Sequence, residues 1–221
     1  MTRALLHALY SNESGIAMKR LASAALWLTI AVECGYIVFA RLVLHLPWGH
    51  LVQPLAFAML FGSLAATQGR IRWIATVVRI VLGAEFALSV ADRFGLLGPP
   101  GHGVSWGDFA HFIAYTRQVN AFLPASFAPI LAVVATVFEA VLGIALILGI
   151  RIPYVARAAA VLLCLFGSAM TFSGLIESQF FYGVFVLAAG ACVVSIADAS
   201  WVSLDNLLRR HRPHCMIVER T

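Results

Sequence analysis

Charged residues are scarce in this chain. They make up 11% of its 221 residues, whereas hydrophobic residues make up 62%. A water-soluble domain carries about 25% charged residues, so this composition excludes an ordinary soluble domain. The few charges stand between long apolar runs rather than along helix faces. The chain is therefore predicted to lie in a membrane.

Cysteine is also rare, and its placement excludes a disulfide framework. Cys34, Cys164 and Cys192 occur singly within apolar runs, and Cys215 lies near the C-terminus. No pair has the C-x-x-C spacing of a redox or zinc motif. We expect each cysteine to act as a small hydrophobic residue.

The motifs of soluble catalysis are missing. The sequence contains no P-loop, dinucleotide fingerprint, G-x-S-x-G or H-E-x-x-H. Every histidine lies outside the confident apolar runs, which excludes paired histidines for intramembrane haem. Asp108 and His111 are spaced i,i+3 after His102, but no further ligand is evident, so no metal site is assigned. Whether the protein is an enzyme stays open.

Six apolar runs are present, and a spanning helix needs about 20 such residues. The predicted fold is an all-α polytopic membrane bundle of six transmembrane helices. The second run is short and contains Gln53 and Pro54, so a re-entrant segment is its alternative. The six runs are 20–42, 49–67, 72–97, 126–150, 153–173 and 179–197.

Lysine and arginine predict the orientation, because they are enriched in cytoplasmic loops. With both termini cytoplasmic, only Arg41, Arg93 and Arg117 fall on the outer side, and eleven basic residues fall inside. A multi-pass protein of the bacterial inner membrane is predicted, without a cleavable signal peptide. The basic loops account for the net charge of +5 without nucleic acid. We interpret 209–212 as a topological anchor, with RNA or anionic lipid as the alternative.

One connection, 98–125, is long. It opens on Gly98-Pro99-Pro100-Gly101, which cannot continue a helix. An amphipathic helical pattern follows and predicts a lid over the outer mouth of the bundle, ended by Pro124. Its apolar side carries Trp106, Phe109, Phe112 and Ile113, and its polar side Asp108, His111, Tyr115 and Gln118.

Two buried charges each precede a glycine by four residues, in Arg79-x-x-x-Gly83 and Glu139-x-x-x-Gly143. Glycines at such positions allow helices to approach closely. Arg79 lies about 10 Å and Glu139 about 16 Å from the cytoplasmic end of its span. A long arginine side chain can bridge that gap, so an ion pair between them is the first hypothesis. Helical side chains lean toward their own N-terminus, which aims these two apart. The alternative is that the charges only set helix register.

Glu33 and Glu85 fall near mid-membrane and are candidates for a proton relay or a quinone-headgroup site. A neutral carboxyl hydrogen-bonded between helices is the alternative. Asp92-Arg93 ends the third run at the outer surface. There the pair either forms a local helix-end or headgroup contact, or Arg93 holds an anionic group beneath the Trp106 segment. The candidate outer-mouth site is Asp92, Arg93, Trp106, Asp108, His111 and Tyr115.

A set of short motifs resembles the DoxX family of small bacterial membrane proteins. The motifs are Arg79-x-x-x-Gly83, Ala91-Asp92-Arg93-Phe94-Gly95, Trp106-Gly107-Asp108-Phe109, Glu139-x-x-x-Gly143 and Phe166-x-x-x-Met170-Thr171. The resemblance implies a four-helix membrane core and a link to quinone-dependent or oxidative-stress redox complexes. It divides the chain into an N-terminal helix pair at 1–70, a DoxX-like core at 71–200 and a basic cytoplasmic tail at 201–221.

Three functions follow as hypotheses. The first is a membrane subunit of a redox assembly, with quinone as its cofactor and a soluble or peripheral oxidoreductase as its partner. The second is a small transporter or proton-coupled channel. The third is a structural or biogenesis factor without chemistry of its own. The lipid bilayer is a partner in each, and self-association into a homo-oligomer is left open.

Overall fold

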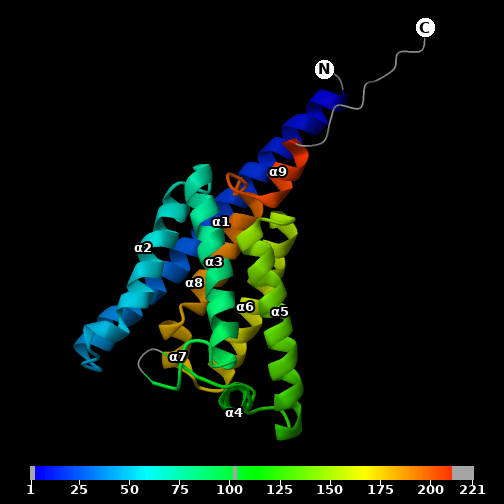
Figure 1. Cartoon of the computed structure of the whole chain (residues 1–221). Coiled ribbons are helices and arrows are strands. Elements are labelled where there is room, and N and C mark those ends of the chain that lie inside the picture. The colour runs from blue at the N-terminus through cyan, green and yellow to red at the C-terminus, as the bar shows by residue number, and fades with distance from the viewer. Residues whose placement is uncertain (1–2, 102–103, 211–221) are drawn as a thin grey trace.

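The computed structural model describes residues 3–101 and 104–210, and helices joined by loops make up the regular structure of this part of the chain (Figure 1). It contains no β-strand, and only an isolated bridge joins Gly101 to Val104. The helices are α1 (Arg3–Leu42), η1 (Trp48–His50), α2 (Val52–Ala66), α3 (Arg72–Arg93), α4 (Phe109–Val119), η2 (Ala125–Phe127), α5 (Ala128–Leu148), α6 (Ile152–Phe172), α7 (Ile176–Phe181), α8 (Val184–Ile196) and α9 (Leu204–Arg210).

Four of these helices are long and apolar enough to cross a membrane, at Gly15–Leu42, Arg72–Arg93, Ala125–Leu148 and Ile152–Phe172. Their outward faces carry many large exposed hydrophobic side chains, as lipid contact requires. The protein is therefore a multi-pass helical membrane protein. Six spans stay a prediction, because α2 and α8 have 15 and 13 residues, about 20 Å each against a hydrocarbon core of about 30 Å. The cytoplasmic termini stay a prediction too.

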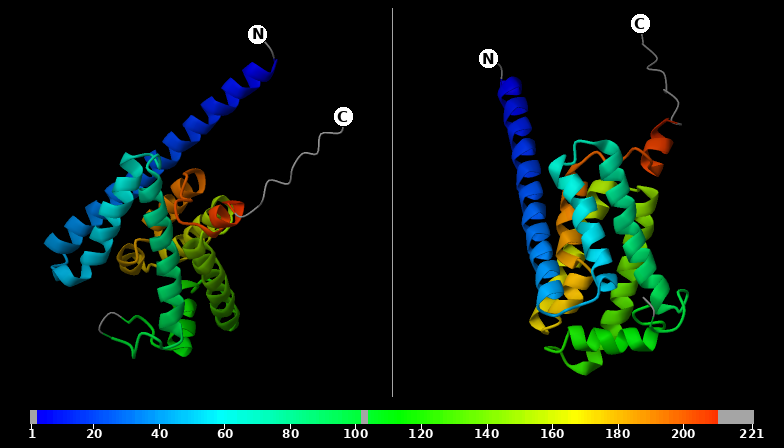
Figure 2. Two further views of the ribbon diagram at one scale, coloured as in Figure 1. Left: turned by 45° about the horizontal axis from the view of Figure 1, so that its top comes forward. Right: turned by 90° about the vertical axis from the view of Figure 1, so that its left-hand side faces the viewer.

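The long helices run alternately up and down the bundle (Figures 1 and 2). We call the end where α3 stops and α5 starts the α4 end, because α4 crosses the bundle there. We call the opposite end the α9 end; the start of α1 extends beyond the bundle on that side (Figure 2). The predicted amphipathic segment thus does form a helix, α4, which covers one end.

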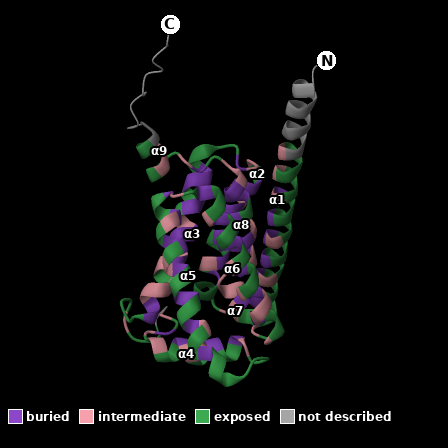
Figure 3. Cartoon of the chain, turned by 90° about the vertical axis from the view of Figure 1, so that its right-hand side faces the viewer, coloured by how far each residue is buried: buried purple, intermediate pink, exposed green. Residues whose placement is uncertain are grey.

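Glycines set the closest helix contacts, as the sequence predicted for α3 and α5. A Cβ on Gly83 would lie 2.8 Å from the carbonyl oxygen of Gly143, and one on Gly143 would lie 3.1 Å from that of Gly83. Phe61 of α2 occupies the space beside Gly190 of α8 in the same way. The buried residues face the interior of the bundle, where these helices meet (Figure 3).

The cysteines do not behave as expected of buried hydrophobic residues. Cys34, Cys164 and Cys192 are all exposed free thiols on the outer surface of the helices. They lie outside the core because the interior positions of their helices are held by residues such as Leu26, Leu163 and Ala191. Cys215 lies outside the described residues.

Replacing Gly83 with Ala should destabilise the bundle, because the new methyl group meets backbone that cannot move aside. Overpacking of this kind costs about 1–3 kcal/mol. Gly62→Ala is the matched control, since Gly62 lies in α2 and a methyl group added there would meet no atom within 4 Å. Thermal unfolding in detergent should show a lower midpoint for Gly83→Ala only. Equal midpoints would contradict the close approach of α3 and α5.

Candidate functional site

A buried ion pair joins α3 to α5 near the α4 end. Nη2 of Arg93 lies 2.6 Å from Oε2 and 2.8 Å from Oε1 of Glu139, and both side chains are 2% exposed. The same nitrogen donates to Oγ of Ser89 at 2.9 Å, and Nη1 donates to Oγ1 of Thr136 at 2.9 Å. Both terminal nitrogens of the guanidinium are thus taken up by neighbouring side chains.

The predicted pair between Arg79 and Glu139 is wrong, and the helix register explains why. Gly83 and Gly143 lie at one level, so Arg79 and Glu139 are offset by eight residues, about 12 Å. Their side chains also lean apart, each toward its own N-terminus. Arg93 is offset from Glu139 by only six residues, about 9 Å, and these two side chains lean toward each other.

Aromatic rings of the lid region cover the ion pair. The Arg93 guanidinium carbon lies 3.6 Å from the ring centroid of Phe112 and 5.3 Å from that of Trp106. The two rings pack edge to face with centroids 5.0 Å apart. A cation over an aromatic face is stabilised, more so when water is excluded. The anionic group that Arg93 was expected to hold beneath Trp106 is therefore the carboxylate of Glu139.

Asp92 anchors the loop that leads into the lid. Its carboxylate accepts backbone N–H groups from Ser105 at 2.9 Å, Trp106 at 3.3 Å and Gly107 at 2.8 Å. Asp92 is itself buried. The local helix-end pairing of Asp92 with Arg93 is not formed, because the two neighbours bind different elements. Both side chains are buried, which disfavours the headgroup contact that was also considered. The sequence placed both residues in one site but not with these partners.

Asp108 and His111 lie on the exposed side of the lid, as predicted. Asp108 caps α4 by accepting the backbone N–H of His111 at 2.8 Å, and its other oxygen lies 2.8 Å from Nδ1 of that ring. Among the described residues no group of three potential ligands gathers for a metal ion. His102 lies outside the described residues.

Tyr115 was assigned to the polar side of the lid, and this was wrong. Its ring is half-buried, 5.6 Å from that of Trp106, and it packs against the core. Tyr182, at the end of α7, shares a hydrogen bond of 2.8 Å with Oγ of Ser105. Burial raises the pKa of both tyrosines, so their hydroxyls stay protonated at neutral pH. A phenol has a mainly apolar ring, which is why polarity alone misplaced Tyr115.

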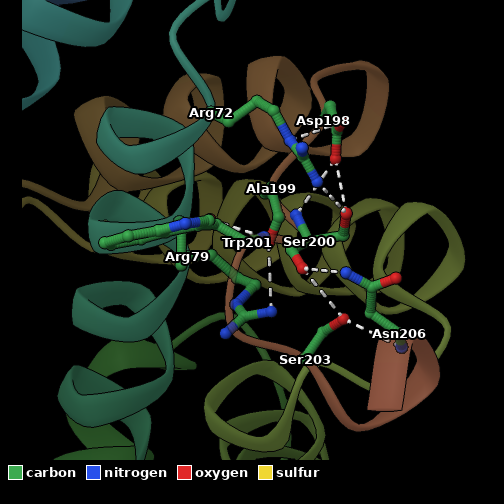
Figure 4. Close-up of polar contacts among 9 residues, drawn as sticks. Arg72, Arg79, Asp198, Ala199, Ser200, Trp201, Ser203 and Asn206 are labelled. Atoms are coloured by element: carbon green, nitrogen blue, oxygen red, sulfur yellow. Dashed lines mark hydrogen bonds and ion pairs between the residues drawn. The ribbon is translucent and has the colours of Figure 1, made fainter. Parts of the chain in front are cut away.

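Arg79 lies at the α9 end, fully buried, and binds backbone carbonyls instead of a carboxylate (Figure 4). Nη1 donates to the carbonyl of Ala199 at 3.1 Å, and Nη2 donates to those of Val202 at 2.5 Å and Ile147 at 3.5 Å. Beside it, Arg72 pairs with Asp198 at 2.8 Å. Sequence reasoning missed these partners because a backbone carbonyl leaves no signal in the side-chain pattern.

The remaining candidates do not join a common cluster. Glu33 lies on α1, 3% exposed, and its Oε1 has no hydrogen-bond partner in the described part of the chain. Glu85 is half-buried on α3, and residues 3–101 and 104–210 show no hydrogen bond or ion pair to it. Arg79 and Arg93 stand fourteen residues apart on α3, about 21 Å. The four residues of the expected cluster, Arg79, Glu85, Glu139 and Glu33, therefore show no hydrogen bond or ion pair to one another in the described part of the chain.

Glu139→Gln should destabilise the protein far more than Glu85→Gln. The first change leaves the Arg93 charge buried without its counter-ion, a loss of about 3–5 kcal/mol for a buried pair. The second removes a carboxyl that pairs with nothing in the described residues. Folded yield and thermal midpoint in detergent measure the difference. Equal effects of the two substitutions would contradict a structural role for the pair.

The first turn of α4 should loosen in acid. The backbone N–H and ring of His111 hold the pKa of Asp108 below its ordinary value of 3.8. A lowered folded-state pKa means that the cap contributes above pH 3.8 and is lost as pH falls through the folded value. Amide protection factors at 110–112 should drop below about pH 4. In Asp108→Asn, which caps without a charge, they should stay constant; a drop there as well would contradict this account.

The comparison with known proteins corrects the family suggested by the sequence motifs. Residues 71–179 match the family model described as methylamine utilisation protein MauE, and the DoxX resemblance is not supported. Two of the motifs, Arg79-x-x-x-Gly83 and Glu139-x-x-x-Gly143, include glycines of the kind that arise wherever membrane helices pack closely. No curated protein and no solved structure matches the chain. The match runs from α3 to most of α7, which is just under half of the chain. It includes every residue of the site at the α4 end. This region is therefore similar to MauE.

Proposed function

We propose that the protein is an integral membrane factor in the use of methylamine or a closely related amine, and that it acts as a structural or biogenesis component without chemistry of its own. The first part is supported by the description of the family that residues 71–179 match. The second part rests on the burial and the internal hydrogen bonds of the Arg93–Glu139 pair.

That pair is closed to a substrate. Both oxygens of Glu139 and both terminal nitrogens of Arg93 are engaged within the protein, and each side chain is 2% exposed. The Phe112 and Trp106 rings cover the guanidinium. A catalytic or transport site needs charged groups that a ligand can reach, whereas these groups hold two helices and the lid together. This geometry favours a scaffold.

The transport hypothesis relied on midplane charges, and the redox hypothesis relied on the DoxX resemblance together with buried carboxyls and an aromatic lid. Because the described residues show no hydrogen bond or ion pair among Arg79, Glu33 and Glu139, the geometry favours neither hypothesis over the scaffold. A quinone cofactor, a soluble oxidoreductase partner and a homo-oligomer stay predictions. The bilayer location at the inner membrane of a bacterium is part of the proposal, supported by the four apolar helices.

Disruption of the gene in the source organism tests the proposal. The disrupted strain should lose growth with methylamine as sole nitrogen source and keep growth with ammonium. Wild-type protein should restore growth, and so should a variant with all four cysteines replaced by Ser, because a scaffold needs no thiol chemistry. Glu139→Gln should fail, with less protein in the membrane on immunoblots.

Two outcomes would contradict the proposal separately. Normal growth of the disrupted strain on methylamine would remove the link to amine use. A cysteine-free variant, or Glu85→Gln, that accumulates normally in the membrane but does not restore growth would show that the protein does chemistry, and would remove the scaffold role.

A further inference from the structure

Hydrogen bonds to other parts of the protein fix the backbone of the segment 199–208, at the α9 end. Arg79 binds the carbonyls of Ala199 and Val202, and the backbone N–H of Trp201 lies 3.3 Å from Oγ1 of Thr76. Figure 4 shows the Arg79 guanidinium directed at this loop. Farther along, Asp205 accepts the backbone N–H of Arg151 at 2.7 Å. The segment is therefore held rigidly against the ends of α3, α5 and α6.

The large apolar side chains of the same segment point outward. Trp201 is 62% exposed, Val202 60%, Leu207 55% and Leu208 57%. Exposed apolar groups gathered in one short segment mark a contact with another apolar phase or molecule. A backbone held from inside cannot turn these side chains into the core, so the protein presents them permanently.

The depth of the segment matches the edge of the bilayer. Thr76, the contact of Trp201, lies only four residues after Arg72, where the apolar span of α3 begins. Four helical residues rise about 6 Å, so Trp201 stands near the boundary between headgroups and acyl chains. Tryptophan is enriched at this boundary, and short amphipathic helices lie in its plane.

The charges around the segment complement anionic lipid. Arg70 and Arg151 are exposed at this end, and α9 ends on Arg209 and Arg210. Of the acidic groups, Asp198 is paired with Arg72, and Asp205 accepts the backbone N–H of Arg151. The excess is basic, and each basic residue near an anionic surface strengthens attachment.

We propose that 201–208 is an interfacial anchor, which lies in the headgroup boundary of the leaflet at the α9 end and binds anionic phospholipid. The apolar side chains enter the acyl boundary, and the exposed Arg70 and Arg151 bind lipid phosphates. Arg79 positions this anchor from the protein interior. The proposal does not depend on the function in amine use.

Depth-dependent quenching tests the anchor in the full chain. A cysteine-free variant carrying Leu208→Cys is labelled with bimane and reconstituted into phosphatidylcholine vesicles with or without phosphatidylglycerol. Lipids brominated near the glycerol should quench this label, and iodide in the water should not. Leu165→Cys, on the exposed face of α6, is the matched control and should be quenched only by lipids brominated deeper in the acyl chain.

The lipid preference is tested in the same chain. Phosphatidylglycerol should increase quenching at position 208, and adding Arg70→Gln and Arg151→Gln should abolish the increase. A label at 208 that iodide quenches and bromolipid does not would overturn the anchor. Protection seen only in native membranes, and lost in pure lipid, would mean that a protein covers the patch and would overturn it too. Quenching that ignores phosphatidylglycerol would overturn the anionic preference.

Discussion

The Arg93–Glu139 pair is the interaction on which the α4 end depends. Moving two charges out of water costs several kcal/mol per ion, and the cost is offset only when their hydrogen bonds are well satisfied. Here Ser89 and Thr136 add hydrogen bonds to the two terminal nitrogens of Arg93. Once formed, the pair ties α3 to α5 and supports the aromatic rings that join α4 to the bundle. The buried charge of Arg93, which would be costly in a membrane without a partner, thus lies where α3, α4 and α5 contact one another.

Two arginines fix the two ends of α3 by different chemistry. Arg93 meets a full negative charge, whereas Arg79 meets only carbonyl dipoles from the segment after α8 and from the end of α5. Between them, Gly83 sets the distance to α5 by leaving no side chain in the contact. These contacts hold α3 near both ends and in its middle. The lid at one end and the 199–208 segment at the other therefore keep fixed positions relative to each other.

Several features of the fold were predictable from the pattern of residues. Long apolar runs marked the four candidate spans, and helical spacing in 109–119 marked the lid, because both signals are local. Arg93, Asp92 and Trp106 were named together as an outer-mouth site, whereas Glu139 was assigned to a separate buried cluster with Arg79. The pairing of Arg93 with Glu139 was not predicted. Depth along a span placed Arg79 and Glu139 within reach of a long arginine side chain, but an ion pair depends on register and on the direction in which each side chain leans.

Composition and apolar run length by themselves indicated a membrane protein of helices, because uninterrupted apolar runs of about 20 residues suit helices, which satisfy their own backbone groups in lipid. The sequence also identified the residues whose partners needed an explanation, namely the few charged residues within the spans or at their ends. Only the tertiary structure decided that Arg93 pairs with Glu139, that Arg79 donates hydrogen bonds to backbone carbonyls and that the ring of Tyr115 packs inward. These choices depend on the register between helices far apart in the chain, and no local pattern records that register.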